Sequence, residues 1–180
     1  MNKPSPSIKD PISVEDYAKV KALLGRTPRG LAAINVRTKT SAPAVIQVES
    51  IVNKKPFPTL FWLVDKQLNY SIDKLEAGGL IAELQMSIDS SDVLQAALKL
   101  DHLAHIALRE ELMLPAHKAA LNSLGFANVF KHRGIGGIEN FTRIRCLHTY
   151  YAAHLVVSNT VGGLLDEYWR EREIYVDHLA

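Results

Sequence analysis

In the first third of the chain, the order of hydrophobic and polar positions is typical of one helix followed by three extended segments. Residues 13–24 begin with a capping Ser13, carry acidic residues in the first turn and stop at Gly25, which predicts a helix. Residues 30–36, 44–52 and 60–64 are rich in β-branched and aromatic side chains and are separated by turn-forming residues. They predict a small antiparallel sheet.

After Asp65 the spacing of apolar residues becomes helical. Gly78 and Gly79 end the first of these segments, and Pro115 breaks the longest one. A loop with Gly134, Gly136 and Gly137 comes before the segment that holds the cysteine. The predicted helices cover residues 65–77, 80–88, about 91–114, 116–124 and 139–158, and the end of the chain from about Leu164.

This order of elements predicts the α+β class, with a small N-terminal antiparallel sheet packed against a helix-rich C-terminal half. No internal repeat or linker divides the chain, so we expect residues 13–180 to form a single domain. Residues 1–12 are expected to be disordered or extended, because Pro4 to Ser7 discourage regular structure.

Composition narrows the class of protein. The 180 residues are 47% hydrophobic and 22% charged, which is ordinary for a globular protein. Apolar runs such as residues 60–64 are far shorter than the roughly 20 residues that span a bilayer, and no apolar run follows Lys3 as in a signal peptide. With one cysteine and a net charge of +2, the chain is expected to be cytoplasmic, with no membrane or nucleic-acid partner.

Reactive side chains are densest in residues 145–154, which contain Arg145, Cys146, His148 and His154. On a straight helix each residue turns by about 100°, so Cys146 and His148 would point to opposite sides and no two of the three Cys and His residues could share a metal ion. Chemistry here therefore requires either that the segment begins in a loop or that each residue joins a partner from another element. Otherwise Cys146 is a small buried side chain and His148 a buried histidine with one hydrogen bond.

The longest predicted helix carries a second polar group. His102, His105 and Arg109 share one side, away from an apolar stripe that includes Val93 and Leu100. The two histidines are close enough to chelate an ion, and Arg109 could bind a carboxylate or phosphate. The alternative is a polar helix face in water.

Several strong motifs are missing from the sequence. There is no Gly-x-Ser-x-Gly, no His-Glu-x-x-His and no Cys-x-x-Cys, and the glycines at 134, 136 and 137 match no nucleotide-binding fingerprint. We therefore expect no cofactor and no tightly held structural zinc, which normally has four Cys or His ligands. A weaker, open site made by one or two histidines and a carboxylate stays compatible with the sequence.

Four segments occur in an order that resembles the bacterial domain-of-unknown-function family 501. They are residues 26–30, residues 56–63, residues 74–76 with Gly79, and residues 145–148 with His154, and the similarity runs from about Arg26 to Asp166. His102 and Arg109 are similar to a His and an Arg of the family. The resemblance implies a bacterial cytoplasmic protein and brings no established activity.

Two departures from the family pattern bear on possible ligands. Asn159 and Gly162 resemble its Asn-Pro-x-Gly-Asp motif, but Thr160 and Gly163 replace the proline and the aspartate. Many relatives carry a cysteine in the early extended region, where this chain has none, which argues against a thiolate-rich metal site.

Two functions follow from these observations. In the first, a polar pocket binds or hydrolyses a small anionic ligand: the candidate catalytic residues are His102, Cys146, His148 and His154, and the candidate ligand-binding residues are Arg109, Arg145 and Asn159. In the second, the chain is a non-enzymatic interaction or regulatory protein whose His and Cys residues are structural. Its C-terminal helix, with Leu165, Trp169, Ile174 and Tyr175, would then dock a partner or a second copy to form a homo-oligomer.

Overall fold

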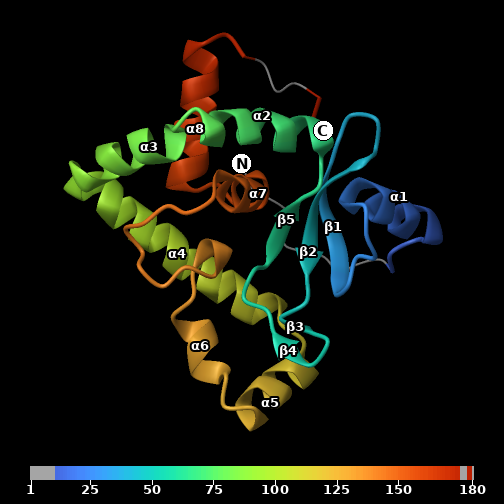
Figure 1. Ribbon diagram of the computed structural model, residues 1–180. Helices are drawn as coiled ribbons and strands as arrows, with labels where there is room; N and C mark the ends of the chain where they lie inside the picture. The colour runs from blue at the N-terminus through green and yellow to red at the C-terminus, as the bar shows by residue number, and fades with distance from the viewer. Residues whose placement is uncertain (1–10, 175–177, 180) are drawn as a thin grey trace, which may run out of the picture.

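A three-stranded antiparallel sheet, in the order β1-β2-β5, organises the N-terminal half (Figure 1). The computed structural model describes residues 11–174 and 178–179, so the expectation for the first ten residues lies outside the described part. The strands are β1 (Leu31–Arg37), β2 (Pro43–Val48) and β5 (Phe61–Leu63). The predicted strand over residues 44–52 is divided at Glu49 and Ser50, which lie between β2 and β3 (Ile51–Val52). Asn53 and Lys54 adopt positive φ and turn β3 onto β4 (Lys55–Pro56).

Both faces of this sheet are covered. Every residue of β2 is buried, which is why its sequence does not alternate between apolar and polar residues. Helix α1 (Val14–Leu24), capped by Ser13 as predicted, packs Val20 against Ile46 and Val48 on one face. Val45 and Leu63 face the main hydrophobic core on the other side.

Helices make up the rest of the chain and confirm the α+β class. They are α2 (Lys66–Ala77), α3 (Leu80–Asp89), α4 (Asp92–Leu112), α5 (Pro115–Ser123), α6 (Ala127–Lys131), the 3-10 turn η1 (Ile135–Gly137), α7 (Leu147–Val156) and α8 (Thr160–Glu171). Within the described ranges, none of them combines the length and the apolar character needed to cross a bilayer.

Helix α7 is the central element of the helical half (Figure 1). It contacts α8, β5, η1 and α2, and it buries five of its ten residues in the main core. These are Leu147, Tyr150, Tyr151, Ala152 and Ala153. A helix enclosed on several sides shows little amphipathic pattern, so its ends were hard to predict from the sequence.

The helix predicted over residues 139–158 is therefore wrong at its start. Residues 139–146 form a loop, and Cys146 is the N-cap residue in an extended conformation (φ −151°, ψ 118°). Gln85 on α3 holds this loop, because its side chain donates a hydrogen bond to the carbonyl of Thr142 and accepts one from the amide of Ile144. Cys146 therefore lies just before the first turn of α7 and is not part of the helix.

The C-terminal helix uses its apolar face internally. Leu165 and Trp169 of α8 belong to the main core, with 0% and 3% of their surfaces exposed. Ile174 is exposed, and Tyr175 lies outside the described residues. The apolar stripe expected to dock a partner is thus largely occupied by the fold itself, and a homo-oligomer stays a prediction.

Candidate functional site

The buried face of α4 is the one that carries its histidines. Leu98, His102, His105 and Arg109 are buried, whereas Val93 and Leu100 are 78% and 66% exposed. The expected apolar stripe is therefore wrong, and so is the alternative of a polar face in water. Polar side chains that are buried require partners, and those partners identify the role of each residue.

His102 is a neutral structural residue with both ring nitrogens engaged. Its Nδ1 accepts a hydrogen bond from the amide of Ile135, so the proton of the neutral ring is on Nε2, which lies 3.1 Å from the hydroxyl of Tyr150. That hydroxyl in turn donates to the carbonyl of Arg143. Burial lowers the pKa of His102 to about 4, which agrees with a neutral ring. His102 therefore faces α7 but has no free nitrogen for proton transfer.

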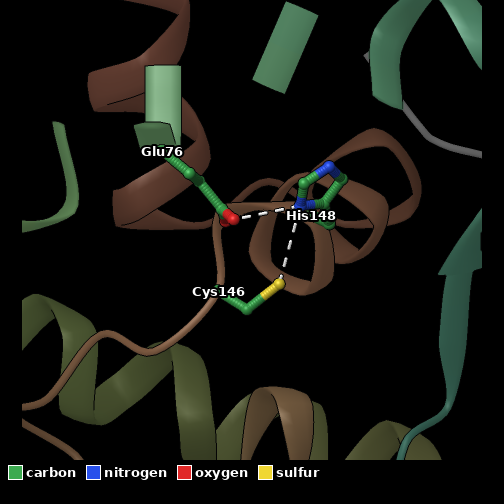
Figure 2. Close-up of side chains that lie close together, drawn as sticks. All are labelled: Glu76, Cys146 and His148. Atoms are coloured by element: carbon green, nitrogen blue, oxygen red, sulfur yellow. Dashed lines mark hydrogen bonds and ion pairs between the residues drawn. The ribbon is translucent and has the colours of Figure 1, made fainter. Parts of the chain in front are cut away.

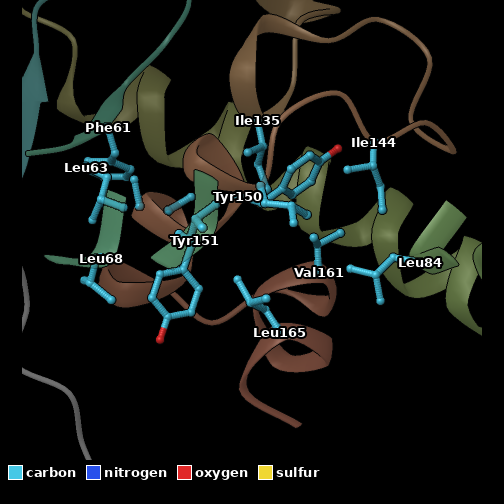
Figure 3. Close-up of a cluster of buried hydrophobic side chains, with 14 of the residues drawn as sticks. Phe61, Leu63, Leu68, Leu84, Ile135, Ile144, Tyr150, Tyr151, Val161 and Leu165 are labelled. Carbon is cyan, nitrogen blue, oxygen red and sulfur yellow. The ribbon is translucent and has the colours of Figure 1, made fainter. Parts of the chain in front are cut away.

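Tyr150 and Tyr151 mark two opposite edges of the core around α7. Figure 3 shows both rings among the apolar side chains, with their hydroxyls pointing in different directions. The Tyr150 hydroxyl meets His102, and the Tyr151 hydroxyl donates to Asp166 on α8. The two tyrosines connect separate polar groups to one core, so the candidate residues do not converge in a single pocket.

The guanidinium of Arg109 binds backbone carbonyl groups and not an anion. It is 1% exposed, and its guanidinium donates to the carbonyls of Pro58, Phe130 and Arg133. Burial lowers its pKa to about 10, so it stays charged at neutral pH. Arg109 thus joins the segment of residues 56–59 to the chain around α6.

His154 and Asn159 form a second structural group where α7 meets α8. Nδ1 of His154 accepts from the amide of Asn159, and Nε2 lies 3.1 Å from Asp166. The side chain of Asn159 caps α8, accepting from the amide of Gly162 and donating to the carbonyl of Tyr150. The family-like Asn and Gly therefore have a clear structural role without the missing proline and aspartate.

Gly162→Ala should destabilise this junction. A Cβ at position 162 would lie 2.1 Å from Cγ of His154, so the imidazole must move and lose its bonds to Asp166 and Asn159. We expect a loss of about 1–3 kcal/mol in unfolding free energy, measured by urea denaturation. Gly163→Ala is the matched control, because no atom lies within 4 Å of its added Cβ. Equal stability of the two variants would contradict the packing role of Gly162.

The remaining candidates, Cys146 and His148, meet Glu76 from α2. Figure 2 shows Glu76 and Cys146 pointing toward the same ring nitrogen of His148 from different parts of the fold. Nδ1 of His148 lies 3.6 Å from Sγ of Cys146 and 3.3 Å from Oε1 of Glu76. Oε1 of Glu76 also accepts from the amide of Leu147, which fixes the carboxylate at the start of α7. We refer to Glu76, Cys146 and His148 as the Glu/Cys/His cluster.

These spacings suit a shared metal ion. The three ligand atoms lie within 4.8 Å of one another, and all three residues are partly exposed. A tetrahedral zinc ion with bonds of about 2.0–2.3 Å places neighbouring ligand atoms about 3.4–3.6 Å apart. The two distances measured from Nδ1 of His148, 3.6 Å and 3.3 Å, come close to this requirement.

The far side of the His148 ring is also held. Nε2 lies 3.2 Å from the carbonyl oxygen of Asn69 and 3.3 Å from Oδ1 of Asp73. A histidine that binds a metal through one nitrogen commonly donates its other N–H to a carbonyl or carboxylate. The hydrogen bond with Cys146, together with the charges of Cys146 and Glu76, raises the pKa of His148 to about 9 against the effect of burial. The cluster therefore attracts positive charge.

Sequence reasoning missed Glu76 as a site residue. Its signal was present in the family-like Lys74-Leu75-Glu76 segment, but no periodicity joins α2 to α7 across about 70 residues. The opposite orientation of Cys146 and His148 on a straight helix does not apply, because Cys146 precedes the helix, as in the alternative in which the segment begins in a loop. The candidate Arg145 is exposed. Gly134 serves close packing, because a Cβ at this position would contact the ring of His102.

Comparison with known proteins gives one match. A family model described as a protein of unknown function (DUF501) matches residues 34–167. It includes every residue of the Glu/Cys/His cluster and confirms the resemblance carried by the segments around Pro56 and Cys146. No curated protein and no solved structure matches the chain.

Proposed function

We propose, from the premise that this chain belongs to the DUF501 family of proteins of unknown function, that it binds one divalent transition-metal ion at the Glu/Cys/His cluster. Zinc fits best, because it accepts thiolate, imidazole and carboxylate ligands together. The observation that carries the proposal is the convergence of the three ligand atoms within 4.8 Å.

Three protein ligands leave a coordination position open. Open positions are typical of catalytic zinc sites, in which the metal lowers the pKa of a bound water and makes it a nucleophile. The open position is proposed to take a water or a small anionic ligand, which the protein binds or hydrolyses. Because Glu76 and Cys146 together neutralise a divalent ion, a singly charged ligand suits the centre better than a highly charged one.

The hydrogen-bond partners of the other candidate residues support the choice of the Glu/Cys/His cluster as the site. His102 and Arg109 are buried with protein partners, and His154 and Asn159 connect α7 to α8. A structural role explains these four residues. By contrast, Glu76, Cys146 and His148 are partly exposed and present three different ligand types to one point.

Metal titration tests the proposal. Protein prepared without a metal-affinity step and dialysed against a chelator should bind one Zn²⁺ or Co²⁺ per chain, as measured by elemental analysis. The cobalt form should show a thiolate-to-metal charge-transfer band, because Cys146 is the only cysteine. We expect Cys146→Ser to abolish this band and to weaken binding by about 10-fold or more, as metal-site substitutions commonly do.

Matched variants separate binding from folding. Glu76→Gln keeps an oxygen for the amide of Leu147 but removes the charge, so it should weaken metal binding while α7 stays capped. His154→Gln is the control, because His154 lies on the same helix beside a carboxylate but outside the cluster. Stoichiometric metal retained by folded Cys146→Ser and His148→Gln variants, or no metal bound by the wild type, would refute the site.

A further inference from the structure

One end of the molecule is a lobe built from the β3–β4 hairpin, α5 and α6 (Figure 1). We refer to residues 51–56 and 113–133 as the α5/α6 lobe. A small hydrophobic core of its own holds these elements together, and its members are Ile51, Met113, Leu121 and Phe130. Arg109 fixes the lobe to the rest of the fold through the carbonyls of Phe130 and Arg133. The surface of the lobe is therefore preformed.

The turn between α5 and α6 exposes apolar side chains. Leu124 and Phe126, on either side of Gly125, have 51% and 40% of their surfaces exposed. Val129 follows on α6 and is also exposed. Gly125 has a positive φ of 73°, which lets the chain turn sharply between these side chains. Single exposed apolar residues are ordinary, but a group of them at one place marks an interaction surface.

Positive charge accompanies these apolar side chains. The sequence has no Asp or Glu between positions 112 and 138, a range that contains Lys118, Lys131 and Arg133. Acidic residues outside this range pair with Lys118 and Arg133, and Lys131 is exposed two positions after Val129. The β3–β4 hairpin adds two more exposed cations at its turn, Lys54 and Lys55. The lobe is thus both apolar and basic on its outside.

We propose that the α5/α6 lobe binds the surface of a bilayer that contains anionic phospholipids, with Leu124 and Phe126 inserted among the acyl chains and Lys131 at the headgroups. Apolar side chains at a turn, with lysines nearby, match the apolar interior and the negative outer layer of such a surface. A nucleic acid would attract the lysines and could stack on Phe126, but it offers no apolar surface to Leu124 and Val129.

The expectation of no membrane partner was drawn from the short apolar runs of the chain, and binding to the surface of a bilayer requires no spanning segment. This function is additional to metal binding, because the α5/α6 lobe and the Glu/Cys/His cluster share no residue.

Co-sedimentation with vesicles tests the proposal. The wild-type protein is mixed with vesicles of phosphatidylcholine alone, or of phosphatidylcholine and phosphatidylglycerol in equal parts, and the bound fraction is measured. We expect binding to the anionic vesicles to be about tenfold tighter or more, since each lysine near an anionic surface contributes about fivefold. Added salt should weaken this binding. Equal binding to the two kinds of vesicle, or binding to neither, would overturn the proposal.

Variants assign the binding to the lobe. Leu124→Ser should weaken it about tenfold through the loss of inserted apolar area, and Lys131→Gln about fivefold. The matched controls are on α4: Leu103→Ser changes a leucine that is also 51% exposed, and Lys99→Gln changes an exposed lysine. Far-UV circular dichroism checks that each variant is folded. Equal effects of Leu124→Ser and Leu103→Ser, or binding to a single-stranded oligonucleotide but not to the vesicles, would contradict a membrane-binding lobe.

Discussion

Replacing Arg109 with methionine should lower the unfolding free energy by about 3–5 kcal/mol. Methionine is long and flexible enough to occupy the space, but it leaves three carbonyls, those of Pro58, Phe130 and Arg133, without a donor. Each such loss costs about 1–3 kcal/mol, and relief from burying the guanidinium offsets part of the total. Urea denaturation of the variant and the wild type measures the difference.

Arg109→Lys should recover only part of this loss, because one ammonium group cannot reproduce the guanidinium fork that reaches three carbonyls. Arg143→Met is the surface control: its side chain is 54% exposed and pairs with Asp89, so the change should cost less than about 1 kcal/mol. If Arg109→Met and Arg143→Met unfold at the same urea concentration, Arg109 does not join the loops as the structure indicates.

The existence of α4 could be predicted from the sequence, but its buried face could not. Capping by Ser91 and helical spacing place the helix within about two residues of its observed ends. Its orientation depends on partners that are remote in the chain: Arg109 bonds to Pro58 and Phe130, and His102 to Ile135. Since a hydropathy pattern treats His and Arg as solvent-facing, it assigns the wrong side whenever buried partners satisfy them.

Two of the three residues of the Glu/Cys/His cluster could be predicted from the sequence. Cys146 and His148 stood out by residue type, yet their convergence depends on an extended N-cap conformation that the loop before α7 imposes. That conformation arises from Gln85 and Glu76, which reach the loop and the first amide of α7 from other helices. Tertiary hydrogen bonds therefore decide the geometry of the cluster, and local spacing rules could not supply it.

Acid should destabilise the protein well above the pH at which carboxylates normally titrate. The pKa values of His102 and His105 fall from 6.5 to about 4 and about 3 in the folded chain, mainly through burial. As pH drops below 6.5, these two histidines take up protons in the unfolded chain but stay neutral in the folded chain. The contribution of these two histidines to stability is therefore fully present above pH 6.5 and is lost as pH falls toward their folded pKa values.

The two histidines together should give a slope of roughly 2.7 kcal/mol per pH unit between about pH 6 and pH 4.5. Unfolding free energies from urea titrations at several pH values in this window measure the slope. His105→Phe keeps a ring against Phe61 but cannot bind a proton, so it should halve the slope. His132→Gln, at an exposed position, should leave it unchanged. A wild-type stability that is flat across this window would show that both histidines gain protons in the native state, contrary to the neutral His102 that bonds Ile135 and Tyr150.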